Sequence, residues 1–216
     1  MTALDITVDE LLTTTRCVRR RLDLTRRVDL SVVEECVGLA QQAPTGADRQ
    51  HWHFIAVTDA SQRERIAELY RSAIGDLPRR SPDALVGVDA SSSEIGRAAR
   101  LLESGRHLAE NLERVPVLMV ACIEAMGEHE TAPGPGQWAS VFPAIWSFML
   151  AARSRGLGTC LTTIHLHHER EVADLLAIPF PRVRQAALIP VAHTIGSDFR
   201  PAVRRPTSEV LHWNGW

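Results

Sequence analysis

The sequence predicts a mixed β-sheet between layers of helices. Four apolar runs have the length and composition of strands, and segments with helical periodicity lie between them. Alternating strands and helices normally favour a parallel, doubly wound sheet. The Gly-x-Gly-x-x-Gly turn of a dinucleotide-binding unit is absent, however, so the elements alone indicate only a mixed sheet with helical layers.

The first part of the chain contains two predicted helices around a strand. The capping-box pattern Ser31–Glu34 opens a helix that ends before Pro44, and Ser61–Glu64 opens another. Between them, Phe54–Val57 has the composition and length of a strand. The stretch from 75 to 93 is polar, with prolines and a run of serines, so we expect a mobile excursion there.

The rest of the chain continues the alternation. A helix is predicted through Leu101–Leu112, and the wholly apolar run Val117–Ile123 indicates a central strand. The segment 137–155 is apolar enough to form a helix buried on most sides, and Pro143 bends it or marks its first turn. The remaining elements are predicted as a strand at 159–164, a helix at 169–177 and a strand at 186–194.

Length and composition indicate an ordinary globular protein. Its 216 residues are 45% hydrophobic, enough to bury a sizeable core in one domain or two small ones. The 24 basic and 26 acidic residues give a formal net charge of -2, so no overall field attracts nucleic acid or an anionic membrane. No apolar stretch reaches membrane-spanning length, and Met1–Glu10 lacks the features of a signal peptide.

The cysteines lie far apart and form no C-x-x-C pair; they are Cys17, Cys36, Cys122 and Cys160. This spacing argues against both a zinc knuckle and a disulfide framework. A reducing cytoplasm is the location that fits best.

Arginines concentrate at the two ends of the chain. The clusters are Arg16, Arg19, Arg20 and Arg21 near the start, and Arg200, Arg204 and Arg205 near the finish. Guanidinium groups bind phosphate oxygens by charge-assisted hydrogen bonds, so the two clusters could converge on one phosphate. On composition alone, two solvated basic surfaces are the favoured interpretation.

Four segments, in order along the chain, resemble motifs of the nitroreductase family. Thr15–Leu22 (TRCVRRRL) resembles the R-S-V-R-R-F opening, and Gln42–Phe54 is similar to the A-P-S-G-x-N-x-Q-P-W-x-F segment. Pro143–Cys160 resembles the long helix that ends in G-L-G-T-C, and Arg204–Val210 is similar to the terminal R/K-x-P-x-x-E-V segment. Together these matches extend from end to end of the chain.

The resemblance implies a single α+β domain over residues 1–216, with a mixed, mostly antiparallel central sheet flanked by helices. It further implies an intertwined homodimer with two FMN sites at the subunit interface. The implied activity passes electrons from NAD(P)H through FMN to a small electron-poor acceptor, a nitroaromatic or a quinone, in a ping-pong cycle. The alternatives are a flavin-binding or storage protein with little turnover, and a flavin-cleaving or dehalogenating relative on the same fold.

Site residues follow from the resemblance where the motifs match. The expected phosphate and ribityl ligands are Arg16, Cys17, Arg19, Arg204 and Arg205, with Arg20 as an alternate. The residues expected to meet the isoalloxazine are Pro44, Thr45, Gly46, Asp48 and Gln50, partly from the partner subunit. Leu161, Thr162 and Thr163 would place a backbone N–H near flavin N5. No residue is assigned as acid, base or nucleophile, because the flavin carries the chemistry.

Three positions depart from the family pattern. Cys17 replaces a Ser, which weakens one expected hydrogen bond, and His51 stands where Pro is usual. Asp48 replaces an Asn, so its carboxylate either turns outward to pair with Arg49 or Arg19, or faces the flavin ring. In the second case the negative charge would oppose reduction of the flavin.

Two further features are the histidine cluster after the predicted strand at 159–164 and the tryptophans at the C-terminus. His165-Leu-His-His-Glu169 could ligate zinc, although such residues between a strand and a helix more often serve as caps or pocket walls. We therefore predict no metal site. Trp213 and Trp216 would be costly to leave in water, so we expect the C-terminal tail to dock on the partner subunit.

Overall fold

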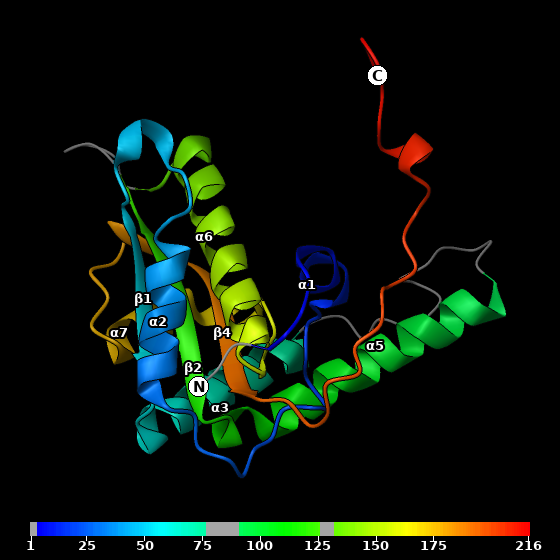
Figure 1. Cartoon of the computed structure of the whole chain (residues 1–216). Helices are drawn as coiled ribbons and strands as arrows, with labels where there is room; N and C mark the ends of the chain where they lie inside the picture. Colours follow the sequence, from blue (N-terminus) through cyan, green and yellow to red (C-terminus); the bar gives the residue numbers. More distant parts are fainter. Residues whose placement is uncertain (1–3, 77–90, 126–131) are drawn as a thin grey trace.

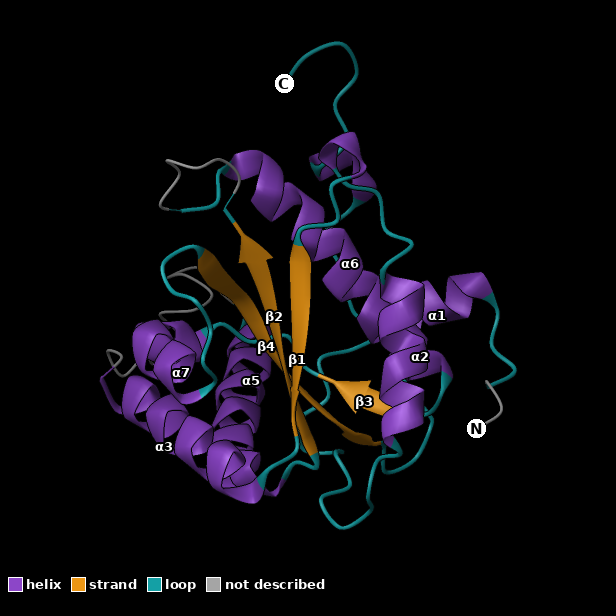
Figure 2. Cartoon of the chain, turned by 90° about the vertical axis from the view of Figure 1, so that its left-hand side faces the viewer, coloured by secondary structure: helices purple, strands orange, loops and turns teal. Residues whose placement is uncertain are grey.

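A four-stranded sheet with helices on both faces forms the body of the protein (Figures 1 and 2). The computed structural model describes residues 4–76, 91–125 and 132–216. The strands are β1 Trp52–Val57, β2 Val117–Glu124, β3 Leu157–Thr159 and β4 Val183–His193. The α-helices are α1 Val8–Thr14, α2 Leu30–Ala40, α3 Ala60–Asp76, α5 Ser92–Asn111, α6 Pro135–Ser154 and α7 Glu169–Leu175.

The sheet has the order β1-β2-β4-β3, and every neighbouring pair of strands is antiparallel. An isolated bridge between Cys17 and Thr159 adds a parallel pairing beside β3. The expected α+β fold with a mostly antiparallel sheet is therefore confirmed. β2 occupies a central position and is buried over Val117–Ile123, as its apolar sequence predicts.

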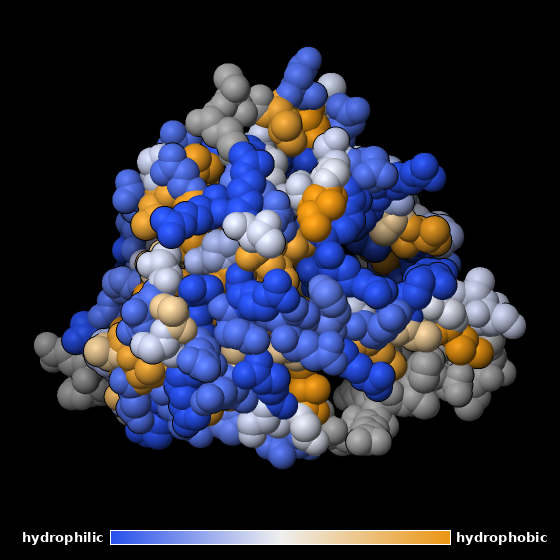
Figure 3. All heavy atoms as spheres, turned by 90° about the horizontal axis from the view of Figure 1, so that it is seen from below, coloured by the Kyte–Doolittle hydropathy of each residue, from blue (hydrophilic) through white to orange (hydrophobic). Residues whose placement is uncertain are grey.

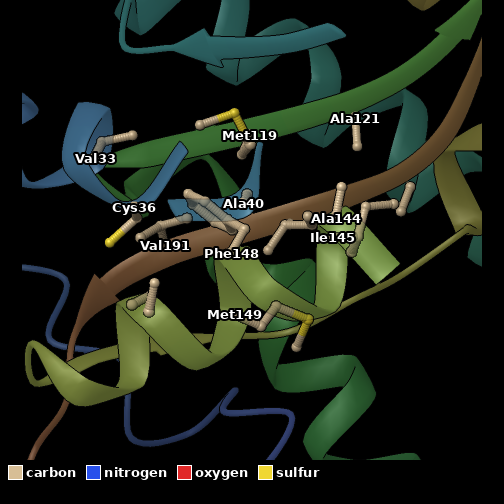
Figure 4. Close-up of a cluster of buried hydrophobic side chains, with 14 of the residues drawn as sticks. Val33, Cys36, Ala40, Met119, Ala121, Ala144, Ile145, Phe148, Met149 and Val191 are labelled. Carbon is tan, nitrogen blue, oxygen red and sulfur yellow. The ribbon is translucent and has the colours of Figure 1, made fainter. Parts of the chain in front are cut away.

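Two hydrophobic cores lie on opposite faces of the sheet. Alternate residues of β2 point to opposite sides, so Met119 joins the core with α2 and α6, while Leu118 joins the core with α3, α5 and α7. Figure 2 shows α3, α5 and α7 together on one side and α2 and α6 on the other. Phe148 of α6 is fully buried in the first core with Ala40 and Val191 (Figure 4).

The two helices predicted from capping boxes in the first part of the chain are present, but the predicted serines are not their capping residues. An aspartate two positions earlier caps each helix: Asp29 Oδ1 accepts from Ser31 N at 3.0 Å, and Asp59 Oδ1 accepts from Gln62 N at 2.9 Å. Each carboxylate also accepts a hydrogen bond from the following serine hydroxyl, Ser31 or Ser61. Because an aspartate caps a helix at least as well as serine, these helices begin slightly earlier than predicted.

The predicted excursion at 75–93 is wrong at both of its ends. Residues 75 and 76 belong to α3, and Ser91 caps α5 in a capping box with Glu94. Residues 77–90 lie outside the described part of the chain. Pro143 lies inside α6 rather than in its first turn, because this helix already begins at Pro135.

The strand predicted at 159–164 is also wrong. β3 begins at Leu157 and ends at Thr159, and the chain turns into a short 3-10 helix over Ile164–His168. Between them, Thr162 pairs with Leu188 of β4 in an isolated bridge. The β-branched residues after Gly158 therefore line the edge of β4 without forming a continuous strand.

The C-terminal tail is highly exposed in the single chain. The tail extends away from the body in Figure 1, and Trp213 is 82% exposed. On α6, Phe142 and Trp146 are also partly exposed. The face seen from below is mainly hydrophilic, with apolar residues scattered over it (Figure 3). Of the helices described, none has both the length and the apolar character to cross a membrane.

Replacing Phe148 by alanine should lower the free energy of unfolding by about 3–5 kcal/mol, because it leaves a cavity in the core between α6, α2 and the sheet. Urea denaturation measures this loss. As a control, Leu101→Ala on the exposed side of α5 should cost far less. Equal losses in the two variants would contradict the placement of Phe148.

Candidate functional site

The residues from Arg16 to Arg21, here called the arginine segment, pack directly on β3. Val18 N–H donates to Thr159 O at 2.8 Å. A Cβ added to Gly158 would lie 2.8 Å from Thr194 Cγ2 and 3.1 Å from Val18 Cβ. Only glycine leaves room for this close approach, so Gly158 fixes where the arginine segment crosses the sheet.

Arg16 meets the C-terminal part of the chain. Its Nη2 donates to Arg200 O at 2.5 Å, and its Nη1 donates to Thr15 O at 3.1 Å. Burial and the nearby charge of Arg204 lower the pKa of Arg16. Neither Arg16 nor Arg204 forms a salt bridge with a described carboxylate. The charge of Arg204, from the other end of the sequence, therefore acts on Arg16, and neither arginine has a carboxylate partner among the described residues.

The other arginines of the segment have different surroundings. Arg20 forms an exposed salt bridge with Glu103 of α5 at 3.4 Å, so it is engaged away from Arg16. Arg21 bonds Asp198 at 2.7 Å and lies over the Phe199 ring, which orders the start of the C-terminal tail. Of the remaining predicted phosphate ligands, Arg19 lies beside Cys17, and Arg205 is exposed.

Cys17 and Cys160 form a pair of neighbouring thiols. The hydrogen bond from Cys160, the Arg19 charge and the Leu161 N–H lower the pKa of Cys17 to about 6, against the opposing effect of desolvation. The same contact and its own burial raise the pKa of Cys160. Cys17 is therefore the sulfur that carries negative charge at neutral pH.

The loop after α2 holds the second group of predicted residues. Thr45 Oγ1 accepts a hydrogen bond from Gln50 N at 3.2 Å, and Asp48 Oδ1 accepts from Gln50 Nε2 at 2.9 Å. Ala47, Asp48 and Gln50 all have positive φ angles, an arrangement that costs conformational energy in residues other than glycine. Pro44 and Gly46 are exposed in the same loop. Such strain is typical of loops with a binding role.

The segment after β3 is anchored by a buried tyrosine. Tyr70 of α3 is hydrogen-bonded through its hydroxyl to Thr162 Oγ1 at 2.9 Å, and Thr162 N–H donates to Leu188 O at 2.9 Å. Leu161 N–H points at the Cys17 sulfur. Thr163 is exposed, and its N–H has no acceptor among the described residues. Of the three predicted residues, Thr163 thus has the free backbone donor.

One chain does not bring both groups of predicted residues together. In Figure 1 the loop of residues 44–50 lies beyond the upper end of α2, whereas the arginine segment lies towards the lower end of that helix. Two surface hollows contain none of the predicted residues; their linings include Arg26, Arg27 and His193 in one and Phe54, Glu124 and Arg182 in the other. Within one chain, the loop and the arginine segment therefore do not form a single site.

The three neighbouring histidines do not converge. His165 is fully buried, and neither ring nitrogen has a hydrogen-bond partner among the described residues. His168 Nδ1 contacts Glu171 Oε1 at 3.0 Å, His167 is exposed, and Glu169 binds Arg184. Across the described ranges, no group of three or more His, Cys, Asp or Glu side chains is arranged to hold a metal ion.

Comparison with protein-family models gives a match over residues 12–193, to the nitroreductase family. The chain belongs to this family. The match covers the arginine segment, the loop at 44–50 and the segment after β3, whereas the C-terminal arginines follow it. A search of curated protein sequences found no match.

Solved structures with the nitroreductase fold resemble the chain over nearly its whole length. An FMN- and NADPH-dependent nitroreductase, NfnB, from a strain named sphigopyxis sp. HMH is 20% identical, with a TM-score of 0.71 and coverage of 98% of this chain and 100% of the other. An iodotyrosine deiodinase bound to FMN and 3-iodo-L-tyrosine is 20% identical, with a TM-score of 0.67 and coverage of 97% and 100%. A BluB-like flavoprotein from Clostridium difficile 630 is 17% identical, with a TM-score of 0.69 and the same coverage. At these identities the likeness shows the fold.

Acidification should destabilise the protein through His165. Burial lowers the pKa of His165 to about 4, below the 6.5 of an ordinary histidine, so the unfolded chain takes up a proton first as the pH falls. The free energy of unfolding should therefore decrease by about 2 kcal/mol between pH 7 and pH 5 from this residue alone. Urea titrations at several pH values measure the slope.

The matched variants are His165→Leu, which should flatten this slope, and His167→Leu at the exposed neighbouring position, which should leave it intact. An unchanged slope in His165→Leu would show that His165 is not the group responsible.

Proposed function

We propose that the protein is an FMN-dependent oxidoreductase that carries electrons from NAD(P)H to a nitroaromatic or a quinone in a ping-pong cycle. The hydrogen bond from Arg16 to Arg200 O, which ties the arginine segment to the C-terminal arginines, is the observation that carries the proposal, and the charge of Arg204 also acts on Arg16. Burial first, and then the charge of Arg204, lower the pKa of Arg16, and a phosphate dianion bound beside Arg16 would offset both effects. The residues present therefore fit an FMN phosphate.

The chain's own residues would bind the two ends of the cofactor differently. Arg16 and Arg204, with Arg19 and Arg205 nearby in sequence, would hold the phosphate by charge-assisted hydrogen bonds. The Thr163 N–H would face the flavin ring as a fixed donor, supported by the hydrogen bond between Tyr70 and Thr162. FMN, when bound, supplies the hydride and electron transfer that no protein side chain can perform.

The ring side of the site would need the partner subunit. Within one chain the loop of residues 44–50 lies away from the arginine segment, so we propose that Thr45, Asp48 and Gln50 reach the flavin of the opposite subunit in a homodimer. The positive φ angles of this loop support a binding role, since the strain must be offset by contacts elsewhere.

A second activity is supported by the structural comparisons. The iodotyrosine deiodinase and the BluB-like flavoprotein resemble this chain almost as closely as the nitroreductase does, with TM-scores of 0.67 and 0.69 against 0.71. Reductive dehalogenation or flavin cleavage therefore stands as the alternative activity. It would use the same phosphate and ring contacts with a different second substrate.

Anaerobic reduction tests the proposed function directly. The FMN-loaded protein should lose its yellow colour with NADH or NADPH and regain it when a quinone is added. A yellow protein that neither nucleotide bleaches would support a storage role. If bleached protein is reoxidised by a halogenated aromatic but not by a quinone or a nitroaromatic, the alternative activity would replace the first.

Removing either central arginine should weaken FMN binding. Each charge-assisted hydrogen bond contributes about 1.5–3 kcal/mol, so Arg16→Ala or Arg204→Ala should raise the FMN dissociation constant about tenfold or more. Arg65→Ala, which removes an exposed arginine paired with Glu68, serves as the control. Fluorescence titration of the apoprotein measures the constants, and unchanged affinity in both variants would exclude a shared phosphate site.

The C-terminal tail should stabilise the homodimer and hold the flavin at the same time. Trp213 and Trp216 are exposed in the single chain, and their burial against a partner would remove a large apolar area from water. Deletion of residues 213–216 should therefore reduce dimer stability and FMN retention together, as measured by sedimentation and absorbance. Replacement of both tryptophans by phenylalanine should preserve most of each. A full-length protein that sediments as a flavin-loaded monomer would contradict this assignment.

Asp48 should lower the potential of the flavin if its carboxylate faces the ring. Because like charges repel strongly in a partly dry site, Asp48→Asn should raise the FMN midpoint potential and speed reduction by NAD(P)H. The shift amounts to about 30 mV for each 1.4 kcal/mol of a two-electron couple. Spectroelectrochemical titration measures it, with Asp174→Asn on the exposed side of α7 as the control. Equal midpoints in wild type and Asp48→Asn would mean that the hydrogen bond with Gln50 keeps the carboxylate away from the flavin.

A further inference from the structure

Two cysteines are brought side by side where the arginine segment packs on β3. Cys17 is the bridge partner of Thr159, and Cys160 follows Thr159 in the chain. Paired strands lie about 4.8 Å apart and rise about 3.3 Å per residue, so diagonal neighbours such as these have Cα atoms about 6 Å apart. This separation lies within the range of about 4.4–6.8 Å that a disulfide spans.

The close packing around Gly158 holds this geometry in place. An added Cβ there would come within 3.1 Å of both Val18 and Leu22, which shows that the arginine segment touches β3 at more than one point. Leu22 also forms an isolated bridge with Thr194. The two cysteines are therefore neighbours through the rigid part of the fold.

The two thiols differ in ways that assign their roles. Cys17 is exposed, lies beside the Arg19 guanidinium, and accepts hydrogen bonds from the Cys160 thiol and the Leu161 N–H. These contacts hold the pKa of Cys17 low. Cys160 is fully buried, and its pKa is raised. An exposed thiolate reacts with oxidants, whereas a buried neighbouring thiol can only reach the first sulfur.

The other two cysteines lack these properties. Burial raises the pKa of Cys36 to about 11 and that of Cys122 to about 12. Both are fully buried, Cys36 in the core with α2 and α6 and Cys122 in the core on the other face of the sheet. They serve as internal controls, since a thiol that stays protonated and inaccessible is inert towards oxidants.

We propose that Cys17 and Cys160 are a peroxide-sensitive thiol pair that closes reversibly into an intramolecular disulfide. The Cys17 thiolate attacks one oxygen of hydrogen peroxide, the O–O bond breaks, and Cys17 becomes a sulfenic acid as hydroxide leaves. The Cys160 thiol then gives up its proton and attacks the Cys17 sulfur, and the S–O bond breaks to release water. Two thiols lose two electrons and two protons, and one peroxide is reduced to two waters. This proposal does not depend on flavin binding.

Peptide mapping of the full chain tests the proposal. The reduced protein is treated with increasing hydrogen peroxide, its remaining thiols are blocked with N-ethylmaleimide, and the peptides are analysed by mass spectrometry without reduction. The expected product is a cross-linked Cys17–Cys160 peptide whose formation spares Cys36 and Cys122 and is reversed by dithiothreitol. A disulfide between two chains, or sulfinic acid at Cys17 with Cys160 still a free thiol, would overturn it.

Variants make the assignment of roles falsifiable. In Cys160→Ala, Cys17 should stop at the sulfenic acid and become trappable by dimedone, and the midpoint of its alkylation rate against pH should rise because a hydrogen-bond donor is lost. A variant with both Cys36→Ser and Cys122→Ser should still form the disulfide. An unchanged alkylation midpoint in Cys160→Ala would show that the two thiols do not touch and would overturn the proposal.

Discussion

The contact between the arginine segment and the C-terminal part of the chain sets the main constraint on this protein. It brings positive charges from opposite ends of the sequence into one region, which costs free energy: Arg16 bonds Arg200 O, and the charge of Arg204, after burial, lowers the pKa of Arg16. The fold accepts this cost because the arginine segment is fixed on β3 and the C-terminal part is tied to it by Arg16 and Arg21. An anion bound beside Arg16 offsets the cost, which is why the arrangement supports a phosphate site.

The neighbouring elements hold the arginine segment and the segment after β3 in position. Gly158 permits the arginine segment to lie against β3, and Tyr70 reaches across from α3 to fix Thr162. The antiparallel sheet places both contacts at the same edge of β4, since β3 and Thr162 each pair with that strand. The strained loop at 44–50 lies elsewhere in the chain, which is why we propose that a second copy of the chain completes the site.

The sequence predicted the central parts of the fold better than their boundaries. β2 and α6 were predictable because their apolar composition is that of buried elements, and the family resemblance supplied the antiparallel sheet. The helix starts were assigned to the wrong residue because an aspartate and a serine two positions apart both match a cap. The prediction of a strand at 159–164 was wrong because β-branched composition does not distinguish a continuous strand from a segment that forms only isolated bridges.

Contacts distant in sequence were harder to predict. The family motifs indicated Arg16 and Arg204 together, and in the structure Arg16 bonds Arg200 O, four residues before Arg204. The hydrogen bond of Tyr70 could not be predicted from the sequence, because its partner Thr162 lies on another element. The wide spacing of the cysteines argued against disulfides, yet spacing along the chain says nothing of Cys17 and Cys160, which the fold makes neighbours.

Mixed dimers test the central claim that each flavin lies between the arginines of one chain and the loop of the other. One chain carries Arg16→Ala with Arg204→Ala, and its partner carries Thr45→Ala with Gln50→Ala. If the site is shared, this heterodimer retains one intact site and binds FMN at half the wild-type stoichiometry, whereas each doubly substituted homodimer binds none. The contradicting result has two parts: this heterodimer binds no FMN, and a heterodimer with all four substitutions on one chain and a wild-type partner still binds one FMN. Together they would show that each site lies within one subunit.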